Sequence, residues 1–226
     1  MKTFSIIHAS ARPNKWRESY EDWMRNAAYP ERIEYLLCVD VGGPFGAPPH
    51  PHVSQVVPEY PNVRLVWNNR RKCCVDAYNA GAAMSTGRIL ILNSDDFFTP
   101  PNWDLKLLSV VEAMDSEFVI EVFVTPRRLL SLQIMSRARY KKLGYALYPE
   151  YQSVRVDVEF TEHARMDGVV LNALHVPFRH AHPGMHGPGW DEVYAHENSL
   201  ESYALGAELL ERRRKSGFPP YIEGGL

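Results

Sequence analysis

Short apolar runs alternate with amphipathic segments along the first half of this 226-residue chain. The runs have the length and β-branched composition of buried strands, and between them apolar and charged residues recur at helical spacing. The predicted strands are 3–8, 33–39, 63–67, 89–92 and 117–124, and the predicted helices are 16–28, 75–84 and 103–114. This alternation indicates an α/β fold with a mostly parallel central sheet flanked by helices.

Two loops and a final helix complete the pattern. The segment Gly42–Pro51 holds three glycines and four prolines, and we expect a loop there at the carboxyl end of the second strand, the edge where open α/β sheets bind ligands. A second Gly/Pro-rich loop is predicted at Pro183–Gly189. The segment Glu197–Lys215 is predicted to be one closing helix with a basic end.

Composition narrows the class of protein. A chain with 45% hydrophobic and 23% charged residues is typical of a globular protein, which excludes a disordered or collagen-like chain. Its net charge of −2 gives no global reason to bind polyanions. No apolar run approaches the length of a transmembrane helix or a signal peptide, so we expect no membrane insertion. Three cysteines, two of them adjacent, do not form a disulfide framework and favour the cytoplasm.

A pair of carboxylates is the clearest chemical feature. The predicted strand 89–92 leads directly into Asn93-Ser94-Asp95-Asp96. Adjacent carboxylates repel each other unless a cation or hydrogen bonds hold them, and oxygen ligands suit Mg²⁺ or Mn²⁺. A solvated turn or a helix cap is the alternative interpretation of these two residues.

The order of several motifs resembles glycosyltransferase family 2, whose members have the GT-A fold. In that family a first strand reads Val-Ser-Ile-Ile-Ile-Pro-Thr, a second ends in Val-Val-Asp-Asp-Gly, a helix contains Arg-Asn-x-Gly and a later strand ends in Asp-x-Asp-Asp. The corresponding segments here are Phe4–Ser10, Cys38–Gly42, Val63–Asn69, Ala77–Ala82 and Gly87–Asp96, followed by Pro100 and Trp103. The resemblance implies a single GT-A (Rossmann-like) domain over residues 1–226, with 1–105 binding a nucleotide-sugar and 106–226 forming the acceptor side and a C-terminal helix.

The resemblance also implies residue roles in a metal-dependent glycosyltransferase. Asp96 would be the main ligand of Mn²⁺ or Mg²⁺, and the donor would be a UDP- or GDP-sugar. The residues expected to bind the nucleotide-sugar are Ala9, Ser10, Arg12, Asp40, Asn69, Arg71, Asn79 and Asp95. Three positions depart from the family pattern. Asn93 replaces the first Asp, Tyr78 replaces the usual Arg, and Val41 replaces the second Asp after strand two.

A cluster of histidines follows the apolar run 169–178. His175, His180, His182 and His186 fall within twelve positions, and in a strand residues i and i+2 point to the same side. Many GT-A enzymes add a late histidine to the metal site, so we expect His182, and next His180, to bind the metal. A mixed Asp/His ligand set suits Mn²⁺ better than Ca²⁺. Ordinary surface or core histidines are the alternative.

A later acidic segment resembles the part of the family that supplies a catalytic base. It runs from Gly189 to Asn198, and Asn198 occupies the position of the family's Asp. An inverting transfer needs a carboxylate to accept the proton of the acceptor hydroxyl, which leaves Asp191 and Glu197 as candidates. The alternative role for either is a helix cap. A retaining transfer needs no such base, so the stereochemistry stays open.

Basic residues gather where acidic ones are absent. No Asp or Glu lies between Glu121 and Glu150, and that stretch holds Arg127, Arg128, Arg137, Arg139, Lys141 and Lys142. Such a stretch favours an anionic acceptor, and DNA with hydroxymethylated bases is one candidate beside soluble or lipid-linked saccharides. A solvated helix face accounts for the same charges without a partner.

Two other functions compete with glycosyl transfer. A nucleotidyltransferase has a related sheet but usually a Gly-rich basic loop after the first strand, and the segment 10–15 has no glycine. A non-catalytic nucleotide-sugar-binding module would tolerate Asn93 and Asn198 in place of carboxylates.

Overall fold

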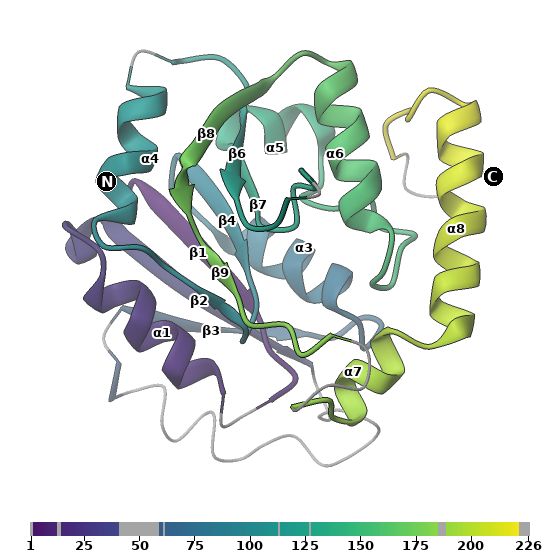
Figure 1. Ribbon diagram of the computed structural model, residues 1–226, viewed down its shortest axis with the longest axis horizontal. Helices are drawn as coiled ribbons and strands as arrows, with labels where there is room; N and C mark the ends of the chain where they lie inside the picture. Colours follow the sequence, from purple (N-terminus) through teal and green to yellow (C-terminus); the bar gives the residue numbers. More distant parts are fainter. Residues whose placement is uncertain are drawn as a thin grey trace.

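A seven-stranded sheet with helices on both faces forms the body of the protein (Figure 1). The computed structural model describes residues 2–12, 15–40, 59–60, 62–112, 114–126, 128–184 and 189–221. The sheet contains β1 (Phe4–Ala9), β2 (Ile33–Asp40), β3 (Val63–Asn68), β4 (Ile89–Asn93), β6 (Val119–Phe123), β7 (Gln133–Ser136) and β8 (Val170–Pro177), while β5 (Phe97–Phe98) and β9 (Arg179–His180) form a separate pair. The predicted loop Gly42–Pro51, Val41, Arg127 and His186 lie outside the described residues.

The order of the strands fixes where a ligand can bind. The sheet runs β3-β2-β1-β4-β7-β6-β8, and only β7 among these strands is antiparallel to its neighbours. The chain moves from β1 outward to β2 and β3 and then returns to β4 on the other side of β1. In open α/β sheets the crevice for a ligand lies at the carboxyl ends of the strands where the order reverses. That place is the carboxyl end of β1 and β4.

Helices cover both faces, as a mostly parallel sheet requires. One face packs against α1 (Trp16–Arg25) and α4 (Trp103–Val111), and the other against α3 (Cys74–Met84), α5 (Arg137–Leu143) and α6 (Val156–Met166) (Figure 1). The short 3₁₀ turn Pro30–Arg32 leads into β2, and the chain ends with α7 (Glu192–Glu197) and α8 (Leu200–Lys215), of which α8 packs against α6.

The two-residue period of the strands divides the core into two layers. Ile6 and Ile91 point to the α1/α4 layer, and their neighbours Ile7 and Leu90 point to the α3/α6 layer. All four are fully buried. Burying a side chain of this size stabilises the fold by about 1.5–3 kcal/mol, so these apolar runs can form only central strands.

Gly81 allows α3 to lie close to the sheet. A Cβ at this position would stand 2.4 Å from Cys38 Sγ and 2.5 Å from Ile7 Cγ2, which no side chain can do without displacing β1 or β2. The close approach places the first turn of α3 beside the carboxyl end of β2. The helix of small residues predicted over 75–84 is therefore observed, and its glycine explains its position.

The predicted helix over 197–215 is wrong in one respect. The structure has two helices, because the chain breaks at Asn198–Ser199 and Ser199 caps α8 by accepting a hydrogen bond from the Ser202 amide at 3.1 Å. A serine side chain satisfies a free amide at a helix start, which favours a new helix over a continuous one.

Candidate active site

A cavity of about 700 Å³ opens at the carboxyl ends of β1, β2 and β4. Its walls come from segments far apart in the sequence: residues 9–12 after β1, the end of β2, the first turn of α3, residues 94–97 after β4, residues 153–158 before and in α6, and α7. A volume of this size suits a ligand as large as a nucleotide. The cavity lies at the switch point of the sheet that the strand order defines.

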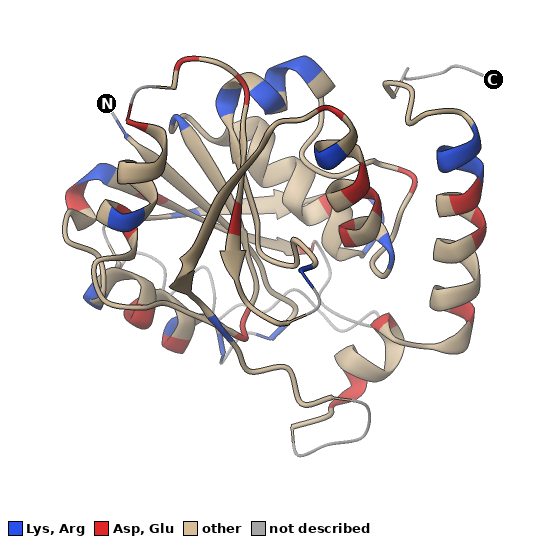
Figure 2. Cartoon of the chain, turned by 45° about the horizontal axis from the view of Figure 1, so that its top comes forward, with Lys and Arg blue, Asp and Glu red and all other residues tan. Residues whose placement is uncertain are grey.

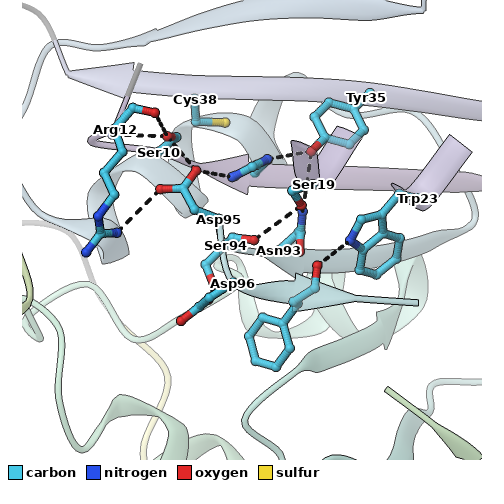
Figure 3. Close-up of polar contacts among 12 residues, drawn as sticks. Ser10, Arg12, Ser19, Trp23, Tyr35, Cys38, Asn93, Ser94, Asp95 and Asp96 are labelled. Carbon is cyan, nitrogen blue, oxygen red and sulfur yellow. Dashed lines mark hydrogen bonds and ion pairs between the residues drawn. The ribbon is translucent and has the colours of Figure 1, made fainter. Parts of the chain in front are cut away.

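Asp95 is held by three side chains around this opening (Figure 3). Its Oδ1 accepts hydrogen bonds from His8 Nε2 at 2.9 Å and from Ser10 Oγ at 2.7 Å, and its Oδ2 lies 3.4 Å from Arg12 Nη1. Only 3% of the Asp95 side chain is exposed. The partners therefore fix the orientation of this carboxylate.

Asp96 makes a different set of contacts. Its Oδ2 lies 3.1 Å from His180 Nε2 and 2.8 Å from the Tyr194 hydroxyl, which donates to it, and Ser94 Oγ donates to Oδ1. Burial alone would raise the pKa of Asp96, but the hydrogen bond and charge of His180, with the bonds from Ser94 and Tyr194, lower it well below its usual range. Asp96 is thus ionised at any physiological pH.

The short pair of strands brings the histidines to Asp96. In the antiparallel register of β5 and β9, Phe97 pairs with His180, and the two rings stack with centroids 4.2 Å apart. His182 follows, with its ring centroid 4.9 Å from that of Tyr194. Burial and the neighbouring His180 lower the pKa of His182, so that its imidazole stays neutral and can act as a ligand.

The metal-coordinating groups around Asp96 suit a divalent ion that takes its remaining ligands from a bound substrate. Within the described ranges, no group of three or more His, Cys, Asp or Glu side chains is arranged to hold an ion alone. Asp96 and His180 nevertheless present one carboxylate and one imidazole nitrogen at the same place. Mg²⁺ and Mn²⁺ are commonly held by one or two such groups with the remaining ligands from substrate phosphates and water. The residues present fit an ion bound together with a diphosphate.

Arg12 ties α7 to the site. Its Nε and Nη2 donate to the two carboxylate oxygens of Asp191 at 2.6 and 2.9 Å, and its guanidinium lies 4.1 Å from the centre of the Tyr194 ring. Asp191 also caps α7 by accepting from the Tyr194 amide. The hydrogen bonds from Arg12 lower the pKa of Asp191 to about 2. Asp191 therefore holds a helix and an arginine, and it is not one of the residues that line the cavity.

The far end of the cavity holds two more carboxylates. Asp40, at the end of β2, accepts from Asn68 Nδ2 at 2.7 Å, and burial raises its pKa. Glu197 lines the same cavity, burial raises its pKa as well, and its Oε2 has no hydrogen-bond partner within the described part of the chain. Ala9 and Ser10 line the cavity with them.

Three residues expected to bind the nucleotide-sugar lie elsewhere. Arg71 pairs with Asp76 at 2.9 Å and donates to backbone carbonyls of residues 149–151, so it joins α3 to a loop. Asn79 bonds through both ends of its amide to the backbone of residues 146 and 147. Asn69 is exposed. None of the three lines the cavity, whereas Lys72 does.

Asp157 was not among the predicted residues, yet it lines the cavity in the first turn of α6. The preceding Arg155 has φ +74°, a strained left-handed conformation that occurs preferentially at functional sites. Burial raises the pKa of Asp157, and Asp157 lines the same cavity as Asp96. The sequence signal is the alternation of apolar and acidic residues in Val156-Asp157-Val158-Glu159.

The residues in the middle of the basic stretch do not form the predicted surface for an anionic acceptor. Arg139 is 1% exposed and pairs with Glu117 and Asp167, while Arg137 donates to Gly87 O and Ser85 Oγ. Lys142 and Arg128 are paired with Glu117 and Glu121. Figure 2 shows acidic residues along α8 as well, with basic ones gathered at its end.

Comparison with known proteins supports the fold and the family resemblance. The model of the family "Glycosyl transferase family 2" matches residues 51–150. The crystal structure of S. aureus TarS superposes with a TM-score of 0.62 at 14% identity, over 96% of this chain and 45% of that one. TarS 1–349 in complex with UDP-GlcNAc gives 0.61 at 16% identity, over 96% and 75%. The Pyrobaculum calidifontis mannosyltransferase PcManGT, in complex with GDP-Man and Mn²⁺, gives 0.62 at 17% identity, over 94% and 75%. No curated protein matches the sequence.

The comparisons identify the fold. The chain has the GT-A fold, with a carboxylate pair after β4 at the switch point of the sheet. Within that fold class it resembles glycosyltransferase family 2, both in its ordered motifs and in the match of its central segment. This chain spans about 45% of the length of the TarS chain. Within the described residues, no helix has the length and apolar character to cross a bilayer.

Proposed function

We propose that this protein transfers a sugar from a nucleoside diphosphate sugar to a hydroxyl group of an acceptor. One observation carries the proposal: Asp95 and Asp96 follow β4 directly and open into the 700 Å³ cavity at the switch point of the sheet. The family match supports it, and so do related structures that contain UDP, UDP-GlcNAc or GDP-Man. The donor we propose is accordingly a UDP- or GDP-sugar, bound by residues 1–105.

The donor would lie along the line of carboxylates and cations in the cavity. Ala9, Ser10 and Asp40 are proposed to contact the base and ribose, because they line the end of the cavity formed by β1 and β2. Arg12, Lys72 and Arg155 line the same cavity and are the cations proposed to lie near the diphosphate. Charge-assisted hydrogen bonds from such groups are roughly twice as strong as neutral ones.

Asp96 and His180 are the residues proposed to hold Mn²⁺ or Mg²⁺, with His182 next to them. The ion, when bound, would neutralise the charge that develops on the leaving diphosphate. In support of this role, Tyr194 and Ser94 hold the two carboxylate oxygens of Asp96 in a fixed orientation.

Asp157 is the proposed general base. The acceptor oxygen would bond to the anomeric carbon as the bond from that carbon to the diphosphate oxygen breaks, and the hydroxyl proton would pass to the Asp157 carboxylate. A raised pKa suits this task, because a base whose pKa lies nearer to neutrality accepts a proton more readily. Glu197 lines the cavity and is the second candidate, whereas Asp191 is paired with Arg12.

The proposed acceptor is a neutral hydroxyl compound bound by the half of the chain from 106 to 226. The alternative of a DNA acceptor depended on a free basic stretch, and Arg137 and Arg139 are instead committed to partners inside the protein.

A thermal-shift and hydrolysis assay tests the proposal. Wild-type protein is measured with UDP, GDP, CDP and dTDP, each with and without Mn²⁺, because a ligand that binds the native state raises the melting temperature. We expect one diphosphate to raise it more with Mn²⁺ than without. The corresponding sugar donor should then be hydrolysed slowly, which a binding module would not do.

Two variants make the assay specific to the site. Asp96→Ala should lose the Mn²⁺-dependent part of the shift, while Asp115→Ala, at an exposed aspartate outside the cavity, should behave as wild type. A wild-type protein that shows no Mn²⁺-dependent shift with any of the four diphosphates contradicts the proposal.

A further inference from the structure

A fully buried histidine lies behind the donor site. His8, in β1, is 0% exposed, and so is Tyr35 in β2. His8 Nδ1 lies 2.5 Å from the Tyr35 hydroxyl, and His8 Nε2 lies 2.9 Å from Asp95 Oδ1. The imidazole therefore joins a buried phenol to a carboxylate that faces the cavity.

The hydrogen-bonding chemistry assigns a direction to this chain of contacts. An ionised carboxylate only accepts, so His8 Nε2 must carry a proton and donate it to Asp95. In a neutral imidazole the other nitrogen is then an acceptor, and the Tyr35 hydroxyl donates to it. Burial raises the pKa of Tyr35, which keeps that hydroxyl protonated. The second contact of a histidine sets its tautomer, and here Tyr35 makes that contact.

Neighbouring polar groups hold Tyr35 in turn. Asn93 Nδ2 lies 2.9 Å from Ser19 Oγ and 3.4 Å from the Tyr35 hydroxyl, and all of these groups are buried (Figure 3). In the family pattern an Ile stands at the position of His8 and an Asp at that of Asn93. An aspartate at 93 would bury a second negative charge beside this network, whereas the amide supplies a donor.

The contacts determine how Asp95 meets a ligand. Oδ1 is occupied by His8 and Ser10, which leaves Oδ2 facing Arg12. We propose that His8 is a positioning residue of the donor site: with Tyr35 behind it, it fixes the orientation of Asp95 so that Oδ2 and Arg12 together receive the donor. This inference rests on the proposed function, because it takes the cavity to be the donor site.

Substitutions at position 8 separate positioning from simple packing. His8→Leu fills the space without a donor, whereas the side-chain amide of His8→Gln can replace Nε2–H. Binding of UDP and GDP is measured by calorimetry, and KM for the sugar donor is measured separately from kcat. Loss of a partner that orients a ligand-binding group commonly costs 10–100-fold in affinity, so we expect His8→Leu to raise Kd and KM about tenfold or more. His8→Gln should recover most of this loss, and kcat at saturating donor should change little.

Two further measurements exclude a purely structural role. In ¹⁵N-histidine NMR spectra, His8 should show one protonated and one unprotonated ring nitrogen, and Tyr35→Phe should shift mainly the unprotonated one. Ser5→Ala, at another buried polar residue of β1, is the matched control: Ser5 bonds to Glu34 away from the cavity, and its replacement should leave donor binding unchanged. If His8→Leu fails to fold, His8→Gln and Tyr35→Phe carry the test.

The outcomes of these measurements distinguish failure of the role of His8 from failure of the proposed function. Donor affinity of His8→Leu equal to that of wild type, or a His8→Gln protein as defective as a folded His8→Leu protein, overturns the role of His8. A spectrum in which Nε2 is the unprotonated nitrogen overturns it as well. Wild-type protein that binds none of the four diphosphates UDP, GDP, CDP and dTDP contradicts the proposed function, and the inference then falls with it.

Discussion

Removing one partner of the ion pair between Arg213 in α8 and Glu159 in α6 should be among the most destabilising single substitutions in this fold. Both side chains are nearly fully buried, with 3% and 4% exposed. Arg213 Nε and Nη2 each donate to Glu159 Oε1, at 3.0 and 2.9 Å, and the guanidinium lies 3.6 Å from the centre of the Tyr148 ring. Because α6 begins one residue before Asp157, the pair also anchors the helix that carries the proposed base.

Replacing the arginine leaves a buried charge without its partner. Breaking a buried pair in this way typically lowers the free energy of unfolding by about 3–5 kcal/mol. For a domain of this size, 1 kcal/mol corresponds to about 2–4 °C in melting temperature. We therefore expect Arg213→Met to melt roughly 6–20 °C below wild type, by the product of these two ranges. The double variant Arg213→Met with Glu159→Leu removes both charges and should recover most of the loss, since apolar replacements of buried pairs are often neutral.

The adjacent arginine supplies the control. Arg214 pairs with Glu162 on the same two helices, but both side chains are more than a third exposed. An exposed pair contributes about 0–1 kcal/mol, so Arg214→Met should melt within about 4 °C of wild type. Melting is followed by circular dichroism, and urea titration gives the free energies. Equal losses for the two single variants, or a double variant less stable than Arg213→Met, would refute the reasoning.

Three further predictions concern the site and its surroundings. Asp157→Asn should lower kcat by about 10²–10⁴-fold, and wild-type kcat should fall as pH drops through a pKa above that of an ordinary aspartate, because burial raises it and only the ionised form accepts a proton; a pH–rate profile measures both. Asp191→Asn should leave kcat unchanged, since Asp191 holds Arg12 and caps α7. Because the pKa of Asp191 is lowered to about 2, its stabilising effect should be full above about pH 4 and lost progressively as the pH falls towards 2, as urea titration at several pH values would show. Fluorescence anisotropy with duplex DNA should find no salt-dependent binding, because Arg139 is buried in ion pairs; strong binding at low salt would reverse this conclusion.

Periodicity predicted β1, β2, β3, β4 and β6 but not β7 and β8, and it was most accurate for β2 and β4, which are buried along nearly their whole length. The predicted strands 33–39 and 89–92 agree with β2 and β4 to within one residue at each end. The same reasoning missed α6, where Val156-Asp157-Val158-Glu159 alternates like a half-buried strand. Tertiary contacts decide this segment: Glu159 is buried against Arg213, and the left-handed backbone of Arg155 starts the helix.

Part of the site could also be predicted, since a strand that ends in carboxylates at a sheet edge indicates where a ligand binds. The sequence predicted Asp95, Asp96 and His180 as site residues, and all three line the same cavity in the structure. It could not show which acidic residue is free to act as a base. Asp191 is paired with Arg12, 179 positions away in the chain, and no local pattern encodes that contact.

The basic residues show most directly why charge along the sequence differs from charge at a site. The acid-free stretch between Glu121 and Glu150 provides structural contacts, as Arg137 donates to a backbone carbonyl and Arg139 pairs with Glu117 and Asp167. Arg12 and Lys72 come from segments on either side of β2, and they reach the cavity because parallel strands bring their carboxyl ends to one edge. An anion site in such a fold is therefore assembled by strand order, and isolated cations beside strand ends indicate it better than a run of cations does.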